Sequence, residues 1–460
     1  MRHLVLGALL FSLAACMGNA PPPIPLNPVR FLLINDVYVA DTMLDGRGGL
    51  ARVATVRKRL ADQGPVLFVL AGDVLSPSLL SKYYGGGQMV DALNAAKLDY
   101  ATFGNHEFDL ELDTLEARIA GSRFKWISSN CTLANGSPLP KVLPWDTLHV
   151  SGHKVGLFAV TLPGNYPAVY RCSDPDSAAQ RVVEALSSEG ADLIVGLTHQ
   201  PVEADRNLLA REPRIDLILG GHEHQALDST VSGRHVAKAD ANARSAQFAT
   251  LWGGKGKWRQ ALGLVPIDAG LPPDSAVSQV VAAWEDSLEH RLGPERTVAT
   301  TGVSIDPGLS LSRRGESMLG GLVTDAIRVG TGTDVALLNS GTLRLDNMIR
   351  PGPITNRQLE SISGRLKELA AQDMPIVVAG DFNDWRHRAT AILERRLGMT
   401  EVSVAHHGRP LATFPSMMPL LRLDRIYVRG FQVTASKVHR GKPWSMLSDH
   451  LAVSAELERA

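Results

Sequence analysis

Short runs of apolar residues recur along the chain up to about residue 267, and most of them end in a polar residue. A run that is apolar at every position is typical of a parallel strand buried on both faces. Residues 48–60 instead place apolar side chains at helical spacing, which predicts a β-α-β unit. Such strands predict stacked sheets covered by helices. The expected strands are 29–34, 66–71, 100–103, 155–160, 193–197 and 215–219, with a further helix at 88–96.

Polar side chains follow five of the expected strands at the point where each strand ends. Because successive strands of an α/β sheet end at one edge, these side chains are expected to meet there. One such residue alone is more often a helix N-cap or an ordinary surface or core residue. Carboxylate, amide and imidazole groups gathered beside glycines, however, fit a pair of divalent transition ions. The residues are Asp36, Asp73, Asn105, His199, His222 and His224.

Two neighbouring ions need a bridging anion, since only a carboxylate with two oxygens offsets both charges at once. Asp73 is expected to be that bridge, because the turn at 72–77 leaves it exposed at a strand end. His222 and His224 alternate along an extended segment. Both can therefore face the ions only if the backbone there is irregular.

Two motifs are specific: Gly-Asn-His-Glu-Phe-Asp at 104–109 and Gly-Gly-His-Glu-His at 220–224. With the other fragments in order, residues 29–359 resemble the 5′-nucleotidase and UDP-sugar hydrolase branch of the calcineurin-like metallophosphoesterases. The resemblance implies an α/β fold, a four-layer α/β/β/α sandwich over 29–290, with two divalent ions that are zinc, manganese or iron. It assigns Asp36 and His224 to one ion and Asn105, His199 and His222 to the other, with Asp73 between them.

The resemblance also implies catalytic roles beside the ions. His106 matches a histidine that acts next to the scissile phosphate, and Asp109 matches the carboxylate that orients it. A cationic His106 would stabilise the phosphoryl oxygens and protonate the leaving alkoxide. Asn105 would also contact substrate, and Glu107 is expected to be structural. The implied protein is an exported phosphohydrolase that acts on phosphate esters, with nucleotides or nucleotide sugars as its substrate class.

Tyr38 departs from the family pattern, which usually has a histidine two residues after the first aspartate. A neutral phenol is a poor metal ligand, although a neighbouring divalent ion improves it. The sequence leaves open whether Tyr38 binds metal, binds substrate or packs, and one ion is expected to be held less tightly. An alternative function follows from this departure, namely a non-catalytic lipoprotein that keeps the phosphatase fold as a binding surface.

Residues 291–359 resemble the start of the C-terminal substrate domain of 5′-nucleotidases, an α/β domain that is truncated here. Arg344 matches an arginine that helps to hold substrate, and an ordinary solvated arginine is the alternative. The aromatic residues that would clamp a nucleobase are not found after residue 359. A phosphate and a metal pair alone do not select a leaving group, so the substrate class stays broad.

Residues 360–460 resemble instead the second half of an endonuclease, exonuclease and phosphatase superfamily domain, a partial α/β sandwich. The first half, which supplies a magnesium-binding glutamate in that superfamily, has no counterpart upstream. The segment is therefore expected to be inactive on DNA, and a magnesium-dependent phosphodiesterase or nuclease is the alternative. The partial second site would comprise Asp381, Asn383, Asp424, Asp449 and His450.

The first 28 residues predict export. A basic start, a short apolar run and small residues describe a signal peptide over 1–20, which is too short to span a bilayer. Leu13-Ala14-Ala15-Cys16 resembles a bacterial lipoprotein box, which implies membrane attachment by lipid at Cys16 and a periplasmic or cell-envelope location. An ordinary secretory signal is the alternative. The Pro-rich residues 21–28 are typical of a stiff spacer.

Composition narrows the choice of partners. Lys and Arg together number 47, as do Asp and Glu, so no overall charge attracts nucleic acid or an anionic membrane. We expect a small phosphorylated substrate, no stable nucleic-acid partner and no partner protein. Beyond Cys16, only Cys131 and Cys172 remain. The sequence leaves open whether these two thiols pair or stay isolated.

Overall fold

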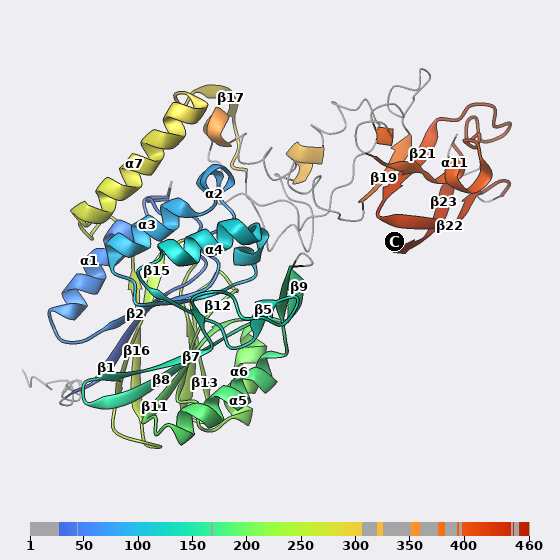
Figure 1. The fold of residues 1–460 in the computed structure, drawn as a ribbon. Helices are drawn as coiled ribbons and strands as arrows, with labels where there is room; N and C mark the ends of the chain where they lie inside the picture. Colours follow the sequence, from blue (N-terminus) through green and yellow to red (C-terminus); the bar gives the residue numbers. More distant parts are fainter. Residues whose placement is uncertain are drawn as a thin grey trace, which may run out of the picture.

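The described part of the computed structural model is mostly the first predicted domain (Figure 1). The predicted signal segment with Cys16 lies outside the described residues, as do Arg344, Asn383 and Asp449. Within the described part, no helix combines the length and the hydropathy that crossing a bilayer requires. The described residues are 27–43, 45–166, 169–305, 320–324, 351–358, 376–381, 393–394, 398–442, 445 and 450–459.

A seven-stranded sheet contains the first three predicted strands, and its order is β16-β15-β1-β2-β3-β4-β6. Five neighbouring strands run parallel, and β15 and β16 pair antiparallel at one edge. The strands are β1 (Val29–Ile34), β2 (Leu67–Ala71), β3 (Tyr100–Thr102), β4 (Lys125–Ile127), β6 (Val142–Leu143), β15 (Ser245–Trp252) and β16 (Arg259–Pro266).

A six-stranded sheet with the order β13-β14-β12-β11-β8-β7 contains the other predicted strands. Its four central strands are parallel, and an antiparallel strand lies at each edge. The strands are β7 (Trp145–Val150), β8 (His153–Thr161), β11 (Leu193–His199), β12 (Leu217–Gly221), β13 (Leu227–Val231) and β14 (Arg234–Lys238). A small sheet joins β5 (Cys131–Leu133), β10 (Tyr170–Cys172) and β9 (Gly164–Tyr166).

The two large sheets stack and are covered by helices on their outer faces, which confirms the predicted four-layer sandwich (Figure 1). Phe31 and Leu33 of β1 contribute to the core between the sheets, whereas Leu32 and Ile34 pack under the helices. Burial on both faces explains why this strand is apolar at every position. The covering helices are α1 (Leu50–Ala61), α3 (Gly87–Ala96) and α4 (Leu112–Gly121) on the first sheet, with α7 (Ser275–Leu292) packed against α1 and α3, and α5 (Pro175–Ser188) and α6 (Val202–Arg211) on the second.

The remaining described elements are short. Helix α2 (Leu79–Tyr84) precedes α3, and β17 (Thr297–Thr301) pairs with β18 (Gly352–Thr355). In the C-terminal segment, β19 (Ile376–Asp381) pairs antiparallel with β21 (Asp424–Arg429). They are accompanied by β20 (Thr400–Glu401), α11 (Val402–His407), β22 (Phe431–Val438) and β23 (Val453–Arg459).

Cys131 and Cys172 form a disulfide that joins β5 to β10, which decides between the two alternatives left by the sequence. The bond closes a loop with a sequence separation of 41 residues. Closing a loop of this size removes chain entropy from the unfolded state worth about 4 kcal/mol.

Replacing both cysteines by serine is expected to lower the free energy of unfolding by about 2–5 kcal/mol. Chemical denaturation of the oxidised wild-type protein and of the double variant would measure the difference. Dithiothreitol treatment of the wild-type protein should reproduce the loss. Equal unfolding midpoints for the two proteins would contradict a stabilising bond.

Candidate metal centre

The predicted ligands lie on loops that leave the carboxyl ends of strands from both sheets. Asp36 follows β1, Asp73 follows β2, His199 ends β11 and His222 follows β12. The backbone φ is +53° at Asp36, +57° at Asp73, +89° at His222 and +61° at His224. Left-handed backbone at a residue other than glycine is uncommon and concentrates at functional sites. The irregular backbone predicted at His222 and His224 is therefore present.

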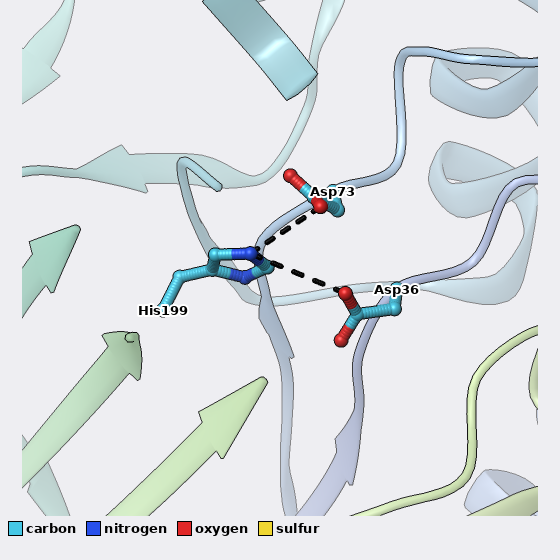
Figure 2. A group of neighbouring side chains, drawn as sticks. All are labelled: Asp36, Asp73 and His199. Atoms are coloured by element: carbon cyan, nitrogen blue, oxygen red, sulfur yellow. Dashed lines mark ion pairs between the residues drawn. The ribbon is translucent and has the colours of Figure 1, made fainter. Parts of the chain in front are cut away.

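Each buried aspartate uses one oxygen for anchoring and presents the other to a common point. Asp36 Oδ2 accepts hydrogen bonds from His222 N at 2.9 Å and Asn35 Nδ2 at 2.8 Å. Asp73 Oδ1 accepts one from His106 N at 2.8 Å. The remaining oxygens, Asp36 Oδ1 and Asp73 Oδ2, face His199 (Figure 2). The anchored oxygens therefore fix the direction in which the free ones point.

His199 is completely buried, and a hydrogen bond fixes its orientation. Its Nδ1 donates to the carbonyl oxygen of Ala71 at 2.9 Å, so Nδ1 carries a proton. Its Nε2 lies 3.3 Å from Asp73 Oδ2 and 4.0 Å from Asp36 Oδ1. The ligand atoms of these three residues lie within 4.8 Å of one another, a spacing that a single metal ion can bridge.

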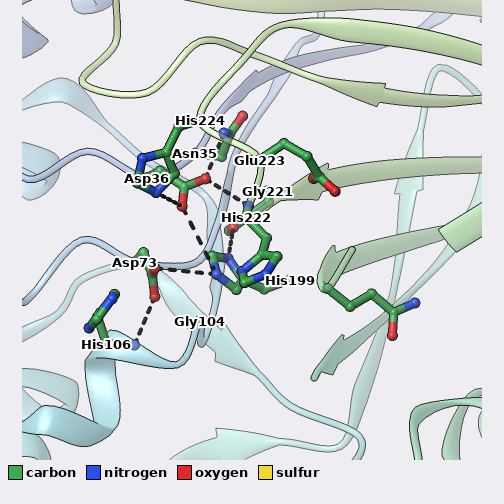
Figure 3. Close-up of polar contacts among 12 residues, drawn as sticks. Asn35, Asp36, Asp73, Gly104, His106, His199, Gly221, His222, Glu223 and His224 are labelled. Atoms are coloured by element: carbon green, nitrogen blue, oxygen red, sulfur yellow. Dashed lines mark hydrogen bonds and ion pairs between the residues drawn. The ribbon is translucent and has the colours of Figure 1, made fainter. Parts of the chain in front are cut away.

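Two of the other three predicted ligands, His222 and His224, lie beside this core (Figure 3). His224 Nε2 is 3.3 Å from Asp36 Oδ1, and the ring centroids of His222 and His199 are 5.3 Å apart. Asn105 follows β3, and its Oδ1 is buried without a hydrogen-bond partner among the described residues. Buried polar atoms are normally satisfied. An amide oxygen without a partner, close to two carboxylates and an imidazole, therefore fits a bound cation.

The protonation states also suit metal binding. Burial would raise the pKa of the Asp36 and Asp73 carboxyls, but the charge of His199 holds the pKa of both below the ordinary value. Burial would lower the pKa of His199, but the two carboxylates raise it to about 10. Burial and the charge of His199 lower the pKa of His222. The carboxylates are therefore anionic, and an ion would replace the proton of His199.

Gly104 and Gly221 lie where any side chain would collide with a neighbouring loop of the metal centre. A Cβ atom on Gly104 would lie 2.0 Å from Asp73 Oδ1, and one on Gly221 would lie 2.3 Å from the carbonyl oxygen of Ala71. Both distances are below any real contact. The glycines of the two specific motifs are therefore required by the approach of one loop to another.

Glu107 holds the loops of Asp73 and Asn105 together, in agreement with its expected structural role. Its fully buried carboxylate accepts hydrogen bonds from the backbone N–H groups of Asp73 at 2.8 Å, Val74 at 2.6 Å, Leu75 at 3.0 Å and Gly104 at 2.6 Å. Four donors on one carboxylate fix both loops relative to each other.

Replacing Glu107 by glutamine is expected to weaken metal binding by about 10–100-fold, as for other residues that orient ligands. The amide NH₂ would point at backbone N–H donors that the carboxylate now accepts. Calorimetric titration of the metal-free protein with Mn²⁺ would measure the affinity. Glu111→Gln, at an exposed position just before α4, is the matched control. An unchanged affinity for Glu107→Gln would show that the loops do not need this carboxylate.

The predicted catalytic pair lies beside Asp73. His106 Nδ1 is 2.7 Å from Asp109 Oδ2, and the same oxygen accepts a hydrogen bond from Ser76 Oγ at 3.2 Å. The backbone N–H of His106 donates to Asp73, and its largely buried ring lies 6.2 Å from the ring of Tyr38, measured between centroids. The imidazole is therefore oriented by Asp109 at the edge of the cluster.

Lys238 is a buried lysine that the sequence analysis did not single out. It contacts the loops that carry His199 and His222. Lys238 Nζ donates to the carbonyl oxygens of Gln200 and Gly221, both at 2.7 Å, and pairs with Asp205 at 2.8 Å and with Glu223. The carbonyls belong to the residues next to His199 and His222. In the sequence, Lys238 lies within the mostly apolar stretch 235–239. This pattern could have pointed to a buried lysine, and a buried lysine needs charged or hydrogen-bonding partners.

The predicted second site is described only in part. His450 Nδ1 lies 2.9 Å from Asp424 Oδ2, and the His450 ring packs 4.7 Å from the ring of Phe414. Asp381 is the register neighbour of Asp424 on the paired strands β19 and β21. These contacts bring three of the five predicted positions together. Asn383 and Asp449 lie outside the described residues.

Known proteins show the same organisation. Residues 29–226 match the family described as calcineurin-like phosphoesterase, and residues 297–371 match the 5′-nucleotidase C-terminal domain. The crystal structure of a 5′-nucleotidase precursor from Thermus thermophilus superimposes with a TM-score of 0.65 at 24% identity, covering 73% of each chain.

Two curated relatives match different shares of the chain. A snake venom 5′-nucleotidase from Naja atra is 24% identical over 367 residues, which are 69% of this chain and 68% of the relative. The uncharacterised protein YbhP from Escherichia coli is 48% identical over 83 residues, which are 18% of this chain. The chain spans about a third of the length of this second relative. The two domain matches therefore show that the chain carries a calcineurin-like phosphoesterase domain, followed by a 5′-nucleotidase C-terminal domain.

Proposed function

We propose that the protein is an exported, metal-dependent phosphoric ester hydrolase that acts on small phosphate monoesters, with nucleotides or nucleotide sugars as the substrate class. One observation carries the proposal: two carboxylate oxygens and His199 Nε2 face one another in a buried cluster beside the His106–Asp109 pair. The names of the 5′-nucleotidase relatives support the class of substrate.

The residues of the cluster fit two divalent ions, with Asp73 between them, Asp36 and His224 at one and Asn105, His199 and His222 at the other. When bound, such ions neutralise phosphate oxygens and lower the pKa of a water molecule. The chain itself supplies the rest. Asp109 orients His106, and His106 can hold a proton for the leaving oxygen. The deep burial of Asp36, Asp73 and His199 keeps solvent from screening these charges.

The test combines metal analysis with three substrates. The purified full chain should contain divalent metal and hydrolyse an aryl phosphate and a nucleoside monophosphate. Chelation should abolish hydrolysis, and Mn²⁺ or Zn²⁺ should restore it. Preference for a bis-aryl phosphate would favour the phosphodiesterase alternative. A protein that neither retains metal nor hydrolyses any of the three would favour the non-catalytic lipoprotein.

Export with lipid attachment at Cys16 is part of the proposal. The Cys131–Cys172 disulfide supports it, because disulfides persist in oxidising compartments. Mass spectrometry of the amino-terminal peptide from membrane fractions would test it. A diacylated Cys16 is expected, and Cys16→Ser should move the protein to the soluble fraction. An unmodified Cys16 would contradict the anchor.

For the C-terminal segment we propose inactivity on DNA, since the glutamate-bearing half of the resembled domain is missing. The His450–Asp424 pair is the observation that favours the opposite view. Incubating the full chain with plasmid DNA in Mg²⁺ distinguishes inactivity from nuclease activity. Cleavage that is lost in His450→Ala would establish the nuclease alternative, and an intact plasmid is the expected result.

A further inference from the structure

The hydroxyl of Tyr38 lies among the proposed ligands of one ion. Its Oη is 3.1 Å from Asp73 Oδ2, 3.5 Å from Asp36 Oδ1 and 3.0 Å from His224 Nε2. We infer that Tyr38 Oη is a further ligand of the ion that Asp36, Asp73 and His224 hold. This inference rests on the proposed function, because it requires the metal pair.

The separations between the four atoms are those of donors around one ion. Donors bound at about 2.1 Å lie about 3.0 Å apart in octahedral and about 3.4 Å apart in tetrahedral geometry. The three distances from Tyr38 Oη, and the 3.3 Å between His224 Nε2 and Asp36 Oδ1, range from 3.0 to 3.5 Å. These four separations are therefore compatible with Tyr38 Oη as a fourth donor to the same ion.

The hydrogen-bonding capacity of the phenol serves only part of this arrangement. A phenol has one proton, so it can donate to only one of the two carboxylate oxygens at a time. Tyr38 is 5% exposed, Asp36 0% and Asp73 2%, so water contributes little beside these three side chains. His199 offsets part of the charge of the two carboxylates without metal. A bound cation would in addition contact all four atoms at once.

The backbone holds the hydroxyl in place before any ion binds. Tyr38 N donates to Asn242 Oδ1 at 2.9 Å, and Asn242 N donates to the carbonyl oxygen of Asp36 at 2.8 Å. The Tyr38 ring packs against the rings of His224 and His106, with centroids 5.6 and 6.2 Å away. Ring packing and the main-chain hydrogen bonds already hold the Tyr38 hydroxyl in position. It therefore loses little conformational entropy when it binds an ion.

Coordination by Tyr38 makes the two ion positions chemically different. When Oη bonds to the ion, the phenol proton leaves to solvent. That ion then has three oxygen donors and one nitrogen, whereas the other has two imidazoles. Oxygen donors favour harder ions such as Mn²⁺ and Fe³⁺, and imidazole suits Zn²⁺. The geometry therefore favours a mixed pair, with the harder ion on the Tyr38 side.

Tyr38→Phe tests the inference because it removes only the oxygen. The metal-free full chain is titrated with Mn²⁺ in a calorimeter and, separately, loaded with Fe³⁺ for absorption spectroscopy. The wild-type protein should bind two ions. Tyr38→Phe should weaken one by more than about 100-fold, beyond the loss expected for a residue that only orients a ligand, and leave the other unchanged. Tyr38→His should restore tight binding, since imidazole is also a ligand.

Tyr100→Phe is the matched control, since the hydroxyl of Tyr100 also bonds to a carboxylate, Asp146 Oδ2, at 2.9 Å. Fe³⁺ in the wild-type protein and in this control should give a visible phenolate-to-iron absorption band that Tyr38→Phe lacks. Two unchanged affinities in Tyr38→Phe, or a band that survives in it, would overturn this inference alone. A wild-type protein that binds no ion would overturn it together with the proposed function.

Discussion

Replacing Asp73 by asparagine is expected to reduce bound metal below one ion per chain and to lower turnover of an aryl phosphate by about three orders of magnitude. The Lewis-acid contribution of the ions amounts to several kcal/mol, and each 1.36 kcal/mol is about tenfold in rate. Asp73 Oδ1 accepts the N–H of His106, and Oδ2 faces His199 Nε2 and Tyr38 Oη. Both oxygens are therefore in use.

An asparagine cannot fill both roles. In one orientation its NH₂ group meets the N–H of His106, and in the other it points at the metal position. Neither orientation leaves an anion between the two ions. The side chain cannot move aside, because the backbone of Gly104 lies against the carboxylate so closely that a Cβ there would be 2.0 Å from Oδ1.

Asp99→Asn is the matched control for this variant. Asp99 precedes β3 in the same sheet, and its Oδ2 accepts the N–H of Phe68 at 2.8 Å. Burial raises the pKa of this carboxyl, so a neutral amide is well tolerated there. Metal content by mass spectrometry and the kcat of both variants would complete the comparison. If Asp73→Asn retains its full metal content, Asp73 does not bridge the two ions.

The sheets could be predicted from the sequence because a strand that is buried on both faces is apolar at every position. Val29–Ile34 is apolar throughout, since alternate residues face two different cores. The strand expected at 215–219 is found at Leu217–Gly221. It ends in the two glycines of the motif, where the approach of Ala71 to Gly221 and of Lys238 to Gly220, rather than β-propensity, determines the sequence.

The convergence of Asp36, Asp73 and His199 could also be predicted, because strand ends in parallel sheets share an edge. The contacts that orient these side chains could not be predicted. Tyr38 is held by Asn242, 204 residues away, and Lys238 reaches the carbonyl of Gln200 across 38 residues. Such contacts depend on the register of β14 and on the loop that follows it, which local patterns do not encode.

Replacing His106 by alanine is expected to lower turnover by at least about 100-fold while metal content stays unchanged. General acid catalysis by a positioned side chain contributes about 10²–10⁴-fold. The metal centre should persist, because His106 contacts Asp73 through its backbone N–H, which alanine keeps. The loss should be larger for an alkyl phosphate than for a nitrophenyl phosphate, since only the alkoxide needs a proton to leave.

His235→Ala is the control, because His235 Nδ1 pairs with Asp228 Oδ1 at the same 2.7 Å on β14 and β13, outside the site. It should leave both substrates unaffected. Asp109→Asn should show part of the His106→Ala loss, as it removes the carboxylate that orients the imidazole and accepts Ser76 Oγ. If His106→Ala instead loses metal, the imidazole is a ligand. If it loses activity equally on both substrates, His106 stabilises phosphoryl charge and does not act as the acid, because proton donation is the only role that depends on the leaving group.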